Sequence, residues 1–130
     1  MNKDLKKIIE TSTLILHKED YVYAKVKTVP LGDKHFLVTR DSNEITVITK
    51  KENIGDLDLI EKSNDRALLE IQFSPDAPDA VGFLAVVSSA LAKRGISISV
   101  ISTYSKDYIL VAKKDADLAV KILTALGLSK

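Results

Sequence analysis

The chain has 130 residues, a formal net charge of +1 and 45% hydrophobic residues. This length suits one domain or two very small subdomains that share a core, and the apolar content excludes a disordered chain. The near-zero charge gives no electrostatic case for binding nucleic acid or acidic membranes, and the absence of cysteine excludes disulfides, zinc–cysteine sites and thiol catalysis. The polar start is unlike a signal peptide, and no apolar run approaches the roughly 20 residues that span a bilayer, so we expect a cytoplasmic protein.

The first half of the chain is predicted to form one short helix followed by strands. Residues 3–10 place Leu5, Ile8 and Ile9 on one helical face. Alternating and β-branched runs predict strands at residues 13–17, 21–28, 35–40 and 44–49. The turn residues Asp41, Ser42 and Asn43 predict that the last two strands form a hairpin. Residues 51–65 are polar and acidic, which predicts a linker or surface crossing with a helical turn at 58–62.

The second half predicts the order strand, helix, strand, strand, helix. Residues 66–73 form the first strand, and a helix begins at Asp79 or Ala80 and ends at Gly95, which is placed to adopt a left-handed conformation. The apolar positions that recur along this helix are Val81, Leu84, Val87 and Leu91. Strands at 96–104 and 108–112 follow. Asp115 then caps a last helix, closed by Gly127, that directs Leu118, Ile122 and Leu126 inward.

These elements contain a recognisable pattern. The segment 76–84 reads Asp-x-x-x-x-x-Gly-Phe-Leu, a helix follows it, and the next strand begins Gly95-Ile96-Ser97-Ile98. This arrangement resembles the ACT domain, the small amino-acid-sensing module of metabolic regulators. The segment Ile101–Val111, read as Ile-Ser-Thr-Tyr-Ser-Lys-Asp-Tyr-Ile-Leu-Val, is similar to the signature of the tandem ACT group that includes the CASTOR arginine sensors. The resemblance covers residues 66–127 and is weaker at residues 35–49.

The resemblance implies an α+β fold of the ferredoxin-like βαββαβ type. The second half lacks the last strand of that unit, because only Leu128, Ser129 and Lys130 follow the last helix. The missing edge must therefore come from the first half or from another subunit. We expect two ACT-like subdomains in tandem that share or exchange an edge strand: a degenerate, strand-rich subdomain at 1–63 and an ACT domain at 64–130.

The resemblance also implies a site for a free amino acid between ACT units. The site residues would come from the loop before the helix and from the end of the following strand: Asp76, Asp79, Ala80, Val81, Gly82 and Phe83, facing Ser102, Thr103 and Tyr104. A helix start offers backbone amides and a favourable dipole to a carboxylate, and a glycine there allows close approach. A tight turn that packs the helix on the sheet, with no ligand, explains the same spacing.

Four further residues are candidates for function: Asp107 and Arg40 have two interpretations each, and a functional role is not expected for the two histidines. Asp107 is either a turn residue that bonds its own backbone or a carboxylate that contacts a ligand's ammonium group or cationic side chain. Arg40 follows Thr39 at a hairpin end, where it is either an exposed strand-end residue or a clamp for a carboxylate. His17 and His35 are isolated in the sequence, without acidic or cysteine partners at ligand spacing, so neither a metal site nor an acid–base catalyst is expected.

The sequence therefore predicts a non-enzymatic regulatory protein that binds an amino acid, needs no cofactor and acts on an effector protein in trans. A homodimer is the expected assembly, because the second half lacks an edge strand. The alternative is a ligand-free interaction module, in which Phe83 and Tyr104 pack against each other and fill the cleft. A ferredoxin-like RNA binder would need exposed aromatic residues and a basic face, which this composition does not supply.

Overall fold

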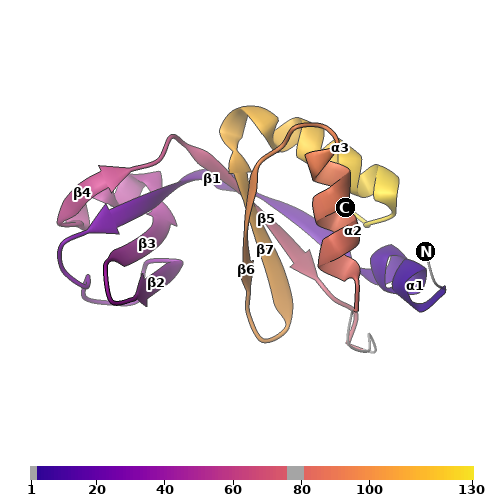
Figure 1. The fold of residues 1–130 in the computed structure, drawn as a ribbon, viewed down its shortest axis with the longest axis horizontal. Coiled ribbons are helices and arrows are strands. Elements are labelled where there is room, and N and C mark those ends of the chain that lie inside the picture. The colour runs from indigo at the N-terminus through magenta and orange to yellow at the C-terminus, as the bar shows by residue number, and fades with distance from the viewer. Residues whose placement is uncertain (1–2, 76–80) are drawn as a thin grey trace. The chain divides into compact units, whose positions relative to one another are not determined.

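The computed structural model describes residues 3–75 and 81–130 (Figure 1). The chain divides into two compact units: unit 1 comprises Met1–His17 and Leu68–Lys130, and unit 2 comprises Lys18–Ala67. The predicted tandem of ACT-like subdomains at 1–63 and 64–130 stays a prediction. None of the helices within the described ranges is long and apolar enough to cross a membrane.

Unit 1 has the ferredoxin-like architecture that the sequence predicts. Its elements are α1 (Lys3–Thr11), the start of β1 (Thr13–Val26), β5 (Arg66–Gln72), α2 (Phe83–Ala92), β6 (Ile98–Ser102), β7 (Lys106–Ala112), a 3₁₀ turn η2 (Lys113–Asp115) and α3 (Ala116–Leu126). The strands lie in the order β1-β5-β7-β6, and α2 and α3 pack against each other. The amphipathic helix predicted near the N-terminus is confirmed as α1, and its three predicted apolar residues are all buried.

The missing edge strand of unit 1 comes from the first half of the chain. The start of β1 lies beside β5, where the last strand of a βαββαβ unit belongs. Residues after α3 run alongside it: Thr13 and Ser129 form a parallel bridge, and the Leu14 amide donates to the Ser129 carbonyl at 2.6 Å. The edge strand of unit 1 is therefore supplied by the same chain. This is one of the two predicted possibilities, the other being a strand from a second subunit.

Unit 2 is a small antiparallel sheet. It contains the rest of β1, β2 (Leu37–Arg40), β3 (Ile45–Lys50), a 3₁₀ helix η1 (Lys51–Asp56) and β4 (Leu59–Lys62). The strand order is β2-β3-β1-β4, around a core of Ala24, Val26 and Val47. The predicted hairpin is confirmed, because Asp41 Oδ1 accepts hydrogen bonds from the amides of Asn43 and Glu44.

Two predictions for the first half were wrong. The runs 13–17 and 21–28 are joined in one continuous strand, β1, because the intervening polar residues stay extended and do not turn. The segment 51–65 is not a linker: it holds η1 and β4, and β4 pairs with β1 through Ala24↔Lys62 and Lys25↔Glu61. An edge strand needs few apolar residues, so its composition resembles that of a loop.

The helices of unit 1 also differ in detail from the prediction. Helix α2 begins at Phe83, and residues 81 and 82 form a turn before it. The buried face of α2 is Phe83, Val87 and Leu91, while Val81 and Leu84 are exposed. In α3 the buried residues are Ala116, Ala119, Val120 and Leu123, so the buried face is shifted by one position from the predicted apolar face. Gly95 does adopt the predicted left-handed conformation, with φ +74°.

Candidate functional site

The start of α2 forms the first part of the predicted site. Gly82 occupies the N-cap position with φ +88°, a left-handed conformation that glycine adopts readily. A Cβ atom at this position would lie 3.5 Å from Leu5 Cδ2, which is an ordinary contact. The glycine is therefore explained by its backbone conformation, without any close approach of a ligand. Asp76, Asp79 and Ala80 lie outside the described residues.

The side chains that flank Gly82 differ in burial. Phe83 is buried, with 1% of its surface exposed, and its ring meets the ring of Phe73 edge-on at a centroid distance of 4.9 Å. Val81 is 83% exposed. No described side chain caps the helix, whose first backbone hydrogen bond runs from the Val86 amide to the Gly82 carbonyl at 3.1 Å. The amides of the first turn have no partner within the helix.

The β6–β7 turn forms the second part of the predicted site. Ser102 Oγ donates to Asp107 Oδ1 at 2.8 Å, and the Thr103 amide donates to the Lys106 carbonyl at 2.9 Å. Asp107 is only 8% exposed, so its carboxylate is a buried acceptor that orders the turn. Tyr104 lies at the tip and is fully exposed. The interpretation of Asp107 as a turn residue that bonds its own backbone is wrong, because Asp107 lies in β7, paired with Ser102 of β6, and its hydrogen bond comes from the Ser102 side chain. The interpretation of its carboxylate as a ligand contact stays a prediction.

The two parts of the predicted site lie at the same end of unit 1. The strands β6 and β7 are antiparallel, and Figure 1 shows their turn and the start of α2 both at the lower end of this unit. Val81 and Tyr104 each leave a large apolar side chain in water there. The alternative pairing of Phe83 with Tyr104 is not formed, because Phe83 is buried against Phe73 and Tyr104 is exposed.

The structure reveals a polar cluster in unit 1 that the sequence analysis missed. His17 Nε2 lies 2.8 Å from Glu70 Oε1, and Gln72 donates to the other carboxylate oxygen. Burial opposes ionisation of Glu70, but the hydrogen bonds from Gln72 and His17 and the nearby positive charges hold its pKa below the usual range. Burial, and secondly the Glu70 carboxylate, raises the pKa of Tyr108. A glutamate inside the apolar run of β5 was the one sequence signal for this cluster.

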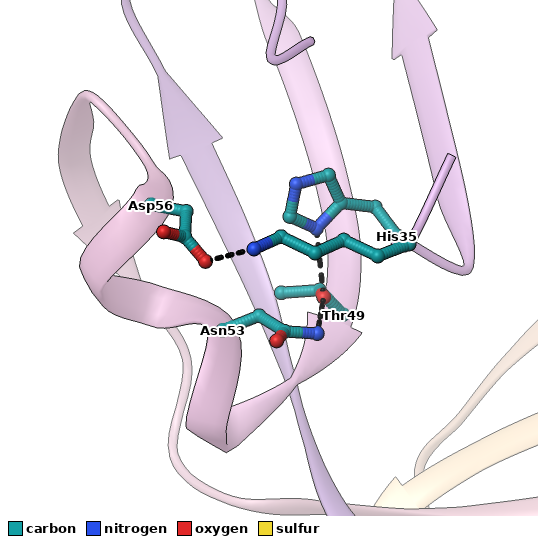
Figure 2. Close-up of polar contacts among 5 residues, drawn as sticks. His35, Thr49, Asn53 and Asp56 are labelled. Carbon is teal, nitrogen blue, oxygen red and sulfur yellow. Dashed lines mark hydrogen bonds and ion pairs between the residues drawn. The ribbon is translucent and has the colours of Figure 1, made fainter. Parts of the chain in front are cut away.

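The second histidine belongs to a separate cluster in unit 2 (Figure 2). His35 Nδ1 lies 2.8 Å from Thr49 Oγ1, which also accepts from Asn53 Nδ2 at 3.1 Å. His35 Nε2 is buried and has no hydrogen-bond partner within the described ranges. Next to it, the hydrogen bond and charge of Lys34 hold the pKa of the Asp56 carboxyl below the usual range. No set of three or more potential metal-ligating side chains is gathered anywhere in residues 3–75 and 81–130.

Solved structures share this fold over nearly the whole chain. A protein of unknown function from Vibrio cholerae, described as a possible transport protein, is 25% identical, with a TM-score of 0.79, and the match covers 96% of this chain and 97% of that one. A protein from Agrobacterium tumefaciens is 24% identical, with a TM-score of 0.70 and coverage of 91% and 90%. The ligand-free regulatory subunit of aspartate kinase from Thermus thermophilus is 10% identical, with a TM-score of 0.64 and coverage of 90% and 98%. The last two similarities show the fold alone.

The family comparison agrees with the geometry of unit 1. No curated protein matches the chain. The ACT domain family matches at residues 64–125, which include β5, α2, β6, β7 and nearly all of α3. The match contains both described parts of the predicted site and every element of the βαββα order. Residues 64–125 therefore belong to the ACT domain family.

Proposed function

We propose that the protein is a non-enzymatic cytoplasmic regulator that binds an amino acid between two ACT units. The observation that supports this most directly is the exposure of Val81 and Tyr104, at 83% and 108%, on the two segments predicted to form the site. Exposed apolar side chains of this size that gather at one end of a domain are typical of an interaction surface. A second copy of the chain that covers them would enclose a ligand between the copies.

The chemistry of this surface suits the two ends of a free amino acid. The uncapped amides at the start of α2 and the helix dipole favour the carboxylate. The free lone pairs of the Asp107 carboxylate, positioned by Ser102, suit the ammonium group. The ligand would bridge two units and favour one packing of them, which an effector protein then recognises.

The effector is expected to be a separate protein. The similarity covers almost all of a protein described as the regulatory subunit of aspartate kinase. If this protein is likewise a regulatory chain, the activity that it regulates belongs to a separate effector protein.

The test is a thermal-shift screen of the protein against the amino acids, combined with analytical ultracentrifugation. A ligand that binds only the native state at a hundred-fold excess over Kd adds about 2.7 kcal/mol, which raises Tm by several degrees. Tyr104→Ser and Val81→Ser should abolish this rise and weaken dimerisation, with little change in the Tm of the free protein. Leu31→Ser is the matched control, because Leu31 is 93% exposed and lies in unit 2.

The design avoids Gly82, because its left-handed backbone would strain any substituted side chain and confuse loss of binding with loss of folding. No Tm rise with any amino acid at millimolar concentration would reject amino-acid binding. A rise that survives both serine variants would reject this site while retaining the ligand.

A further inference from the structure

Unit 2 contains a pocket whose lining residues lie outside the ACT segment 64–125. It has a volume of about 350 Å³, and its wall includes Lys25, Lys27, Arg40, Ile45 and Ile60 together with the turn at 41–43. All of these residues lie within Lys18–Ala67. The volume is at the lower end of the range for small-molecule sites, so the pocket suits a ligand smaller than a nucleotide.

The walls of the pocket are fixed by strand pairing. Arg40 pairs with Ile45 across β2 and β3, Ile45 pairs with Val26 across β3 and β1, and Val26 pairs with Leu59 of β4. The turn between β2 and β3 is closed by the Asp41 amide, which donates to the Glu44 carbonyl at 3.0 Å. Side chains on paired positions of four neighbouring strands are held more precisely than side chains on a loop.

The cations of the pocket are less engaged than its carboxylates. Asp41 Oδ1 accepts two turn amides, and Glu44 lies 4.0 Å from Lys25 Nζ in an exposed pair. No hydrogen bond or ion pair is found for the side chains of Arg40 and Lys27 within the described residues. The electrostatic field inside the pocket therefore favours an anionic group of a ligand. Arg40 can bind a carboxylate or phosphate group in a bidentate manner.

One wall of the pocket is apolar. Ile60 is 50% exposed, an unusual degree for isoleucine, and Val26 beneath the pocket is 3% exposed. A ligand with a short hydrocarbon body would cover Ile60 while its charged end meets Arg40 and Lys27.

We propose that this pocket is a second binding site, for a small organic anion whose carboxylate or phosphate group binds Arg40 and Lys27 and whose hydrocarbon body contacts Ile60. This site is independent of the amino-acid site proposed for unit 1. Its cations are solvent-exposed, so binding weakens as salt concentration rises.

The test is an NMR titration of the ¹⁵N-labelled full chain at constant ionic strength. The probes are 4-methylpentanoate, acetate, inorganic phosphate and the uncharged 4-methylpentan-1-ol. We expect saturable shifts of the amide signals of residues 25–27, 40–45 and 60, with 4-methylpentanoate stronger than acetate and no response to the alcohol. A stronger response to phosphate than to either carboxylate would identify a phosphate ligand within the same proposal.

The variants separate the charged and apolar contacts. Arg40→Gln should weaken binding about tenfold, the size expected for one charge-assisted hydrogen-bonded contact. Ile60→Ser should weaken binding of 4-methylpentanoate and leave phosphate binding unchanged. Lys18→Gln, which removes an exposed cation of the same unit outside the pocket, is the control and should have no effect. Shifts that do not saturate, or that Arg40→Gln and Lys18→Gln change equally, would overturn the proposal.

Discussion

Gly82 allows a direct test of the explanation given for the start of α2. Its φ of +88° costs an L-amino acid about 1–2 kcal/mol, while the replacement of glycine by alanine stabilises a compatible site by about 0.4–1 kcal/mol through the unfolded state. The added Cβ makes only an ordinary contact with Leu5, so no steric term is added. Gly82→Ala should therefore lower the free energy of unfolding by about 1 kcal/mol, or Tm by roughly 3–5 °C for a chain of this size.

The assay is urea and thermal denaturation of three variants followed by circular dichroism. Gly82→Asn should cost less than Gly82→Ala, because asparagine enters the left-handed region more readily. Gly55→Ala is the matched control: its Cβ would meet nothing within 4 Å and its φ is not left-handed, so its effect should stay within about 0.5 kcal/mol. If Gly82→Ala is as stable as the wild type, or if asparagine costs more than alanine, the conformational explanation is wrong.

Three further predictions concern unit 1. The folded-state pKa of Glu70 lies below its unfolded value of 4.5, so the stabilisation that this carboxylate gives is present above pH 4.5 and is lost as pH falls through the folded-state pKa. Glu70→Gln should therefore flatten the loss of stability as pH falls below 4.5 in urea titrations, and parallel curves for the two proteins would contradict this. Leu128→Ala should cost about 2–4 kcal/mol by denaturation, since Leu128 is 3% exposed, and a cost under about 1 kcal/mol would show that the segment after α3 is not anchored. Ser102→Ala should cost about 1–2 kcal/mol, because it leaves the buried Asp107 carboxylate without its donor; an unchanged Tm would refute the role given to this hydrogen bond.

The elements with strong local signals were predictable from the sequence. The short amphipathic helix, the hairpin around Asp41 and the left-handed Gly95 each depend on residues close together in the chain, and the structure confirms them. The missing edge strand was also predictable, because counting the strands of the second half showed that one had to be supplied from elsewhere.

The features that the sequence did not predict depend on long-range partners. Strand β4 has the composition of a loop and is a strand only because β1 pairs with it. Glu70 and His17 are 53 residues apart and meet only when β1 lies beside β5. Helix α2 begins after Gly82 and not at Asp79 or Ala80, because the chain turns through a positive φ before it enters the helix. For the site itself, the sequence indicated which two segments to examine, and the exposure of Val81 and Tyr104 came from the structure alone.

The origin of the edge strand of unit 1 has a consequence for how the chain folds during synthesis. Thr13–His17 leaves the ribosome early, but its neighbour β5 follows unit 2 in the chain, and the residues after α3 follow later still. The first strand must therefore wait, unpaired, while unit 2 is produced and can fold as a continuous segment. Completion of unit 1 is then a late, non-local closure, a type of step that is slow and exposes a strand edge. Two nascent chains close together could exchange this strand, so refolding at high protein concentration should yield strand-swapped dimers.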